Sequence, residues 1–149
     1  MSQASDAAVI LIRENKSRVE RHAVFFMSKN WIRISAISVL LCIFIGIYIS
    51  HGMAQQFTVP DLHRYWTAVI YHVLHSTTIL ILGFSSDLLI QSIYRNIISL
   101  CFLLGILLFC GTLYLLIIFE LSSLSFLTPV GGSAFILGWI ILFFSFLKR

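Results

Sequence analysis

The sequence predicts an all-α membrane protein in which four transmembrane helices form a compact bundle. Three observations support this fold class. Of the 149 residues, 59% are hydrophobic and 11% are charged, and the mean hydropathy is +0.98, whereas a soluble domain carries about 25% charged residues. The apolar residues gather in four uncharged runs, each near the roughly 17–25 residues that a bilayer-spanning helix needs. Lys and Arg collect beside one set of run ends, which indicates a defined orientation.

The first run, Ile34–Ser50, follows a charged tail of residues 1–33. It lies too far from the amino terminus to be a cleavable signal peptide, so we expect it to be the first span. The tail holds six basic and three acidic residues, and it is either a helix on the anionic inner surface or a partly disordered segment. Because the tail supplies no span and Met27 offers an alternative start, we expect residues 1–26 to be dispensable for insertion and folding.

The second run, Ala68–Phe84, lies between two connections of different character. The outer connection, Gly52–Thr67, contains Asp61, which is predicted to cap the start of a short helix leading into the run. The inner connection, Ser85–Asn96, contains three apolar residues at 88–90, which we expect to lie along the membrane interface.

The third and fourth runs, Ile97–Phe119 and Val130–Leu147, complete the predicted bundle. No run alternates with the period of two that strands of a membrane barrel show. In this arrangement nine of the ten Lys and Arg residues lie on one side, and Arg64 lies on the other. Because basic residues are retained on the cytoplasmic side, we predict that both termini are cytoplasmic.

Several classes of function are disfavoured by composition. Cys42, Cys101 and Cys110 all lie within apolar runs without a CxxC pair, and we interpret them as small packing residues. The pI near 9.2 is explained by basic residues beside the spans, so we expect no nucleic-acid partner. No nucleophile is accompanied by a base and an orienting group. We therefore expect neither an enzyme nor a cofactor.

Small residues recur where helices would approach each other closely. They are spaced four apart in the first run and seven apart in the fourth, and such spacing lets helix backbones come together in lipid. We interpret the pattern as packing within one bundle, with a homodimer face as the alternative. The predicted packing residues are Ser38, Cys42, Gly46, Gly105, Gly111, Gly131, Gly132 and Gly138.

Polar residues from all four runs are predicted to meet at one level in the outer half of the membrane. Ionisable groups at membrane depth usually face the bundle interior, so the set is a candidate outward-opening pocket for a proton, a metal or a small ligand. His51 and His75 would suit two axial haem ligands, or a metal site together with Glu120. The alternative is neutral histidines that hydrogen-bond helix ends to loop carbonyls. The set comprises His51, Tyr71, His72, His75, Glu120 and Thr128.

Four sequence blocks resemble the YgdD/YwdK-like family of small inner-membrane proteins of uncharacterised function, which has a mitochondrial relative in animals. They read GIYISHGM at 46–53, TAVIYHVLHS at 67–76, GILLFCGTLYLL at 105–116 and TPVGGSAFILGW at 128–139. The resemblance runs from about Ile34 to the end of the chain and implies four helices in a bacterial cytoplasmic membrane. The chain departs from the family pattern at Ser50, usually alanine, and at His72, often glutamine, so a chemistry that depends on His72 is not expected throughout the family.

These observations favour a non-enzymatic integral membrane protein with a structural or accessory role. A transporter or channel subunit that uses the outer His/Glu pocket is the first alternative, and a haem- or metal-binding membrane protein is the second. The expected partner is the lipid bilayer, with another membrane protein or a second copy of the chain as further candidates.

Overall fold

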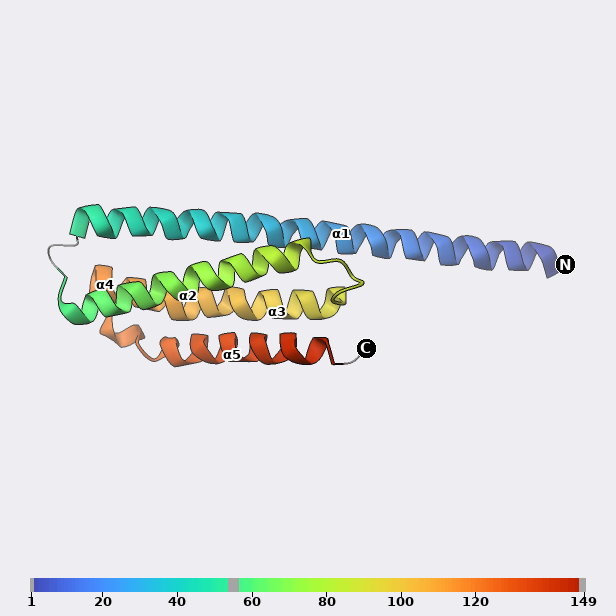
Figure 1. Cartoon of the computed structure of the whole chain (residues 1–149). Coiled ribbons are helices and arrows are strands. Elements are labelled where there is room, and N and C mark those ends of the chain that lie inside the picture. The colour runs from blue at the N-terminus through green and yellow to red at the C-terminus, as the bar shows by residue number, and fades with distance from the viewer. Residues whose placement is uncertain (1, 54–56, 148–149) are drawn as a thin grey trace.

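The computed structural model describes residues 2–53 and 57–147, and the side chains of residues 13–19, 29–51 and 57–147. All of its regular elements are helical (Figure 1). They are α1 (Ser2–Tyr48), the π-helical turn η1 (Ile49–Met53), α2 (Val59–Phe84), α3 (Ser92–Gly105), the π-helical turn η3 (Ile106–Cys110), α4 (Gly111–Phe119), the short 3-10 helix η4 (Ser122–Leu124) and α5 (Leu127–Ser145).

Among the described residues, four helical segments are long and apolar enough to cross a membrane. This confirms the predicted all-α protein with four candidate spans. Each segment is longer than the apolar run that it overlaps, because the helical structure begins before the run; the fourth segment ends at Ser145, two residues before the end of its run. The segments are Lys29–His51, Val59–Phe84, Ser92–Phe119 and Ser122–Ser145.

The helices form a bundle with α2 near its centre (Figure 1). α1 packs along α2, α3 packs mainly along α5, and α2 also contacts α3, η3 and α4. The core between them is apolar, and Ala68, Ile79, Ile98 and Phe102 are completely buried in it. α1 and α5 turn most of their side chains away from the bundle, so these two helices provide much of the surface that would face lipid.

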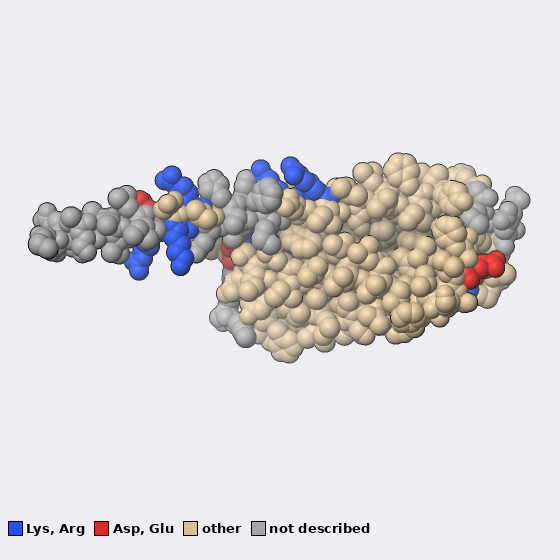
Figure 2. Space-filling view, turned by 180° about the vertical axis from the view of Figure 1, so that it is seen from behind, with Lys and Arg blue, Asp and Glu red and all other residues tan. Residues whose placement is uncertain are grey.

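The tail continues the first span as one helix. α1 runs without a break from Ser2, and its amino-terminal part projects beyond the other helices (Figure 1). The sequence left a surface helix and a partly disordered tail as alternatives; the structure has a helical backbone in line with the span. Lys and Arg side chains gather over the tail and the first turns of the bundle, while the broad middle of the bundle carries no charge on the face in Figure 2.

A capping box starts α2 earlier than predicted. The Thr58 hydroxyl accepts a hydrogen bond from the backbone N–H of Asp61, and the Asp61 carboxylate accepts one from the backbone N–H of Thr58. Thr58 is therefore the N-cap and Asp61 the third helical residue, so the prediction of Asp61 as cap was wrong. Because α2 starts at Val59, Tyr71 and His72 lie near the middle of this helix and not in an outer half.

The connection between α2 and α3, which the sequence predicts on the inner side, is held by a buried arginine. The Arg95 side chain is 1% exposed, and its Nη1 donates to the Ser85 carbonyl oxygen at 3.1 Å and to Asp87 Oδ1 at 2.7 Å. These bonds hold the chain just after the carboxyl end of α2, where a positive charge is favourable. Of the three apolar residues expected at the interface, Leu88 and Leu89 are exposed whereas Ile90 is buried.

Three glycines allow α5 to lie close against α3 and η3. A Cβ added at Gly131 would lie 2.3 Å from the backbone nitrogen of Phe109. A Cβ at Gly105 would lie 2.3 Å from the Phe135 ring, and one at Gly138 would lie 2.5 Å from the Phe102 ring. A methyl group fits none of these positions without movement of its neighbours.

The other predicted packing positions are of two kinds. Ser38 and Cys42 are buried on the side of α1 that faces α2 and α4, and a Cβ at Gly46 would make an ordinary contact of 3.5 Å with the Tyr65 hydroxyl. Gly111 and Gly132 have room, because the nearest atoms to an added Cβ lie at 3.8 Å and 3.7 Å.

Candidate functional site

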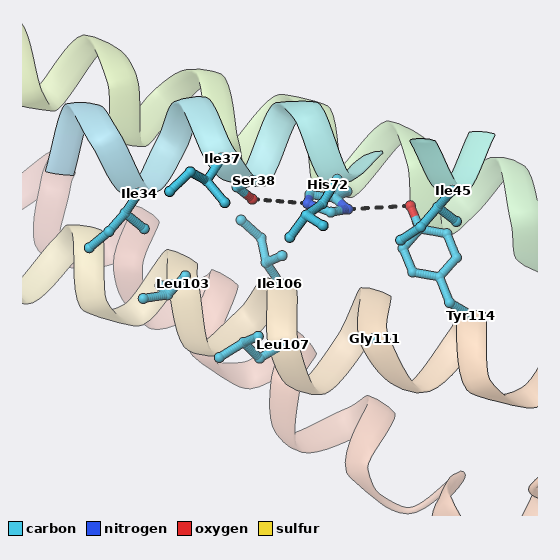
Figure 3. A pocket seen from close by; sticks show the side chains of 11 residues that line it. Ile34, Ile37, Ser38, Ile45, His72, Leu103, Ile106, Leu107, Gly111 and Tyr114 are labelled. Carbon is cyan, nitrogen blue, oxygen red and sulfur yellow. Dashed lines mark hydrogen bonds between the residues drawn. The ribbon is translucent and has the colours of Figure 1, made fainter. Parts of the chain in front are cut away.

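Five polar side chains form a buried cluster between α1, α2 and α4, which we call the His72 cluster (Ser38, Cys42, His72, Ser76 and Tyr114). The Ser38 hydroxyl lies 2.9 Å from His72 Nε2 and 2.8 Å from the Ser76 hydroxyl. The Tyr114 hydroxyl lies 3.4 Å from His72 Nδ1 and 3.8 Å from Cys42 Sγ. The cluster therefore joins three helices through polar contacts, of which Figure 3 shows those of His72 with Ser38 and Tyr114.

Helical spacing explains how the cluster assembles. Ser38 and Cys42 are one turn apart on α1, and His72 and Ser76 are one turn apart on α2. Residues four apart share a helix face, so each helix presents two polar groups to the same contact. Tyr114 approaches this contact from α4 (Figure 3).

A cavity of about 310 Å³ lies beside the His72 cluster, and we call it the lateral groove. Apolar side chains of α1 form one wall, side chains of α3 and η3 form the other, and Ser38, His72 and Tyr114 border it (Figure 3). Its full lining is Ile34, Ile37, Ser38, Leu41, Ile45, His72, Leu103, Ile106, Leu107, Gly111 and Tyr114.

The second histidine of α2 belongs to a separate aromatic cluster, which we call the His75 cluster (Tyr71, His75, Phe102, Phe135 and Trp139). The His75 ring stacks on the Phe135 ring with centroids 3.7 Å apart. Its Nε2 accepts a hydrogen bond from Trp139 Nε1 at 3.1 Å, and its Nδ1 lies 2.7 Å from the Tyr71 carbonyl oxygen. Because an indole N–H only donates and a carbonyl only accepts, the proton of His75 sits on Nδ1 and the ring is neutral.

The end of the bundle at which α2 begins carries the remaining predicted pocket residues. Arg64 Nη1 donates to Asp61 Oδ1 at 2.8 Å, and the two residues border a hollow of about 390 Å³ together with Glu120, which we call the Asp61 hollow. Glu120 is exposed and ends α4 with a left-handed backbone, at φ 54°. His51 is also exposed. The Thr128 hydroxyl oxygen is buried, and no group in the described part of the chain hydrogen-bonds to it.

The predicted outer pocket is therefore divided in the structure. His72 belongs to one cluster, Tyr71 and His75 belong to a second, and Glu120 borders the Asp61 hollow. His75 has a contact to each ring nitrogen, neither of them from His51. Among the residues whose side chains the structure describes (13–19, 29–51 and 57–147), no group of three or more His, Cys, Asp or Glu is placed to hold a metal ion.

Sequence reasoning missed three hydrogen-bonding members of these clusters. Ser76, Tyr114 and Trp139 were not assigned to the polar set. The signal for Ser76 was its spacing of four from His72. Trp139 carried a weaker signal, since a Trp inside an apolar run must place its N–H near an acceptor.

Comparison with known proteins identifies the family. A family model described as a protein of unknown function (DUF423) matches residues 45–132. The chain is 32% identical over 114 residues to the UPF0382 membrane protein YwdK of Bacillus subtilis, covering 76% of this chain and 93% of YwdK. It is 31% identical over 108 residues to the UPF0382 inner membrane protein YgdD of Escherichia coli, covering 72% of this chain and 82% of YgdD. No solved structure matches significantly. The family resemblance in the four sequence blocks is thus confirmed, and the chain belongs to the DUF423/UPF0382 family of membrane proteins.

Proposed function

We propose that the chain is a non-catalytic component of a bacterial cytoplasmic membrane, where its bundle acts as a structural or accessory unit for another membrane component. The observation that carries this proposal is the pairing of His75. Both of its ring nitrogens are used in contacts to Tyr71 and Trp139, so the ring links α2 to α5 and offers no nitrogen to a substrate. The location is supported by similarity to YgdD, an inner membrane protein by name.

We further propose that both termini are cytoplasmic. Nine of the ten Lys and Arg residues would then lie inside. Reporter fusions at Pro60 and Ser123 should report the outer side, and a fusion at Ser92 should report the inner side. An inner signal at Ser123 would contradict this topology.

The two alternatives find less support in the geometry. The Asp61 hollow is bordered by Asp61, Arg64 and Glu120 but by no member of the His72 or His75 clusters, so a transported ion in this hollow would not contact the buried histidines. An axial haem ligand needs an available imidazole nitrogen. His75 would have to give up its contact with Trp139 or Tyr71 to supply one.

A test of the accessory role is site-specific photo-crosslinking in living cells. Ile136 on α5 is 62% exposed, whereas the adjacent Phe135 is 3% exposed. A photoreactive amino acid at position 136 should capture a second membrane protein, and the same group at position 135 should react only within the chain. Capture should persist when the cells are lysed in mild detergent and the crosslinked band is identified by mass spectrometry.

Two results would contradict the proposal. One is the absence of any protein adduct from position 136 and from two further exposed positions, Phe44 on α1 and Phe143 on α5. The other is ion or solute flux in liposomes that contain only the purified chain, since this would establish transport.

A further inference from the structure

The lateral groove opens toward the lipid. Three of its wall residues are more than half exposed: Ile37 at 59%, Leu41 at 53% and Leu107 at 60%. Ser38 and His72, which border it, lie near the middle of the candidate spans Lys29–His51 and Val59–Phe84. An occupant of the groove must therefore reach it through the hydrocarbon layer, and it must be soluble there.

The polar border of the groove contains a hydrogen-bond donor that is only weakly used. The Tyr114 hydroxyl is 3.4 Å from His72 Nδ1, which is long beside the roughly 2.5–3.0 Å of O–H···O hydrogen bonds. Its other contact, at 3.8 Å, is with Cys42 Sγ, and sulfur is a weak acceptor. A buried donor gains free energy when a better acceptor comes within reach. The groove thus combines apolar walls with a donor that lacks a close acceptor.

The helix that forms the second wall is irregular at this place. Ile106 and Leu107 belong to the π-helical turn η3, and single π-turns within α-helices occur frequently at functional sites. The size of the groove, its apolar walls and its few polar groups together match the general character of small-molecule sites.

These features select an uncharged ligand with acceptor oxygens. A charged head group is costly at this depth, and the ester carbonyls of a phospholipid lie at the membrane interface instead. We propose that the lateral groove binds the ring of a lipid-soluble quinone, with one ring carbonyl accepting a hydrogen bond from the Tyr114 hydroxyl. This inference goes beyond the accessory role and does not depend on it.

The first test compares two probes on the purified full-length chain in detergent. Decylubiquinone carries ring carbonyls, and decylbenzene carries the same alkyl chain on a ring without them. A ligand that binds the folded state raises the melting temperature, by roughly 5 °C or more at about 100 times its Kd. Decylubiquinone should give this shift and decylbenzene should give a much smaller one. Equal shifts would overturn the proposal, because the polar border would then not recognise the ligand.

The second test uses three variants. Tyr114→Phe removes the donor and should weaken decylubiquinone binding about 2- to 10-fold. Gly111→Leu should fill the groove, because Gly111 lines it and an added Cβ has no neighbour within 3.8 Å, and should weaken binding at least about 10-fold. Gly132→Leu is the matched control: Gly132 has similar room but lines a different hollow, beside His75, so binding should be unchanged.

The outcomes separate clearly. Unchanged affinity in Gly111→Leu, or equal loss in Gly132→Leu, would exclude the groove as the site. Where Tyr114→Phe elutes as aggregate, the comparison of the two probes on the unaltered chain decides whether the ring carbonyl is recognised. Photo-crosslinking at position 136 tests the accessory role, and quinone binding tests the groove. The two experiments are independent, so a negative result in one does not decide the other.

Discussion

The adjacent glycines at the start of α5 provide a matched pair for testing the helix packing. In Gly131→Ala the new Cβ would lie 2.3 Å from the Phe109 backbone nitrogen and 2.8 Å from the Leu108 carbonyl carbon. Both atoms belong to the backbone of η3, so neither can rotate away, and α5 would have to move by roughly 1 Å. In Gly132→Ala the new Cβ would meet only the edge of the Phe109 ring at 3.7 Å, an ordinary contact.

The two substitutions should therefore change stability in opposite directions. Overpacking costs about 1–3 kcal/mol, and replacing a helical glycine by alanine contributes about 1 kcal/mol of stabilisation. For Gly131→Ala the contact with backbone atoms places the cost at the upper end, and we expect a net loss of about 2 kcal/mol. Gly132→Ala should gain up to about 1 kcal/mol.

The measurement is the free energy of unfolding in mixed detergent and SDS micelles, followed by circular dichroism. The expected difference between the variants is roughly 3 kcal/mol, which is well above the error of such titrations. Equal stability of the two variants, or a more stable Gly131→Ala, would refute the close approach of α5 to η3.

Three further predictions concern polar contacts, each read from the same unfolding titration unless stated. Trp139→Phe keeps the ring but leaves His75 Nε2 without its donor, and it should cost about 1 kcal/mol; no loss would argue against this hydrogen bond. Asp87→Ala should cost about 1–3 kcal/mol, because it leaves the buried Arg95 guanidinium without its carboxylate partner. Arg95→Met should cost less, because it removes the buried charge itself; the reverse order would contradict the buried position of Arg95. Thr58→Ala should cost about 1 kcal/mol and speed amide hydrogen exchange in the first turn of α2; unchanged exchange would contradict the capping box.

Much of the fold could be predicted from the sequence, because a span in lipid leaves a strong signal. An uncharged run such as Ile97–Phe119 has the length and hydropathy of a span on its own. The ends of the helices were less predictable. Thr58 and Asp61 are three apart, and either has a side chain suited to an N-cap; the reciprocal pair of hydrogen bonds that assigns Thr58 as the cap depends on backbone geometry.

The polar clusters could be predicted only in part. His72 and His75 are three residues apart on α2, so their rings point in different directions around the helix. Because α2 has neighbours on several sides, the His72 ring meets α1 and α4 whereas the His75 ring meets α5. The sequence does not give the rotation of α2 about its axis that decides these contacts. A helix such as α5 is apolar all round, and its periodicity therefore cannot indicate which side meets the bundle. For that reason the partnership of Trp139 with His75 depends on the three-dimensional arrangement.

The π-helical turn η3 determines the direction, around the helix axis, in which every later side chain of the third span points. Such a turn holds one residue more than an α-helical turn, and each residue of an α-helix advances the side-chain direction by about 100°. Without that residue Tyr114 would point roughly a quarter of a revolution away from His72, although α3 would still meet α5 as before. A one-residue deletion or insertion within Ile106–Cys110 would therefore rotate α4 about its own axis. It would change which helix the side chains of α4 contact, and it would hardly change the length of the span across the bilayer.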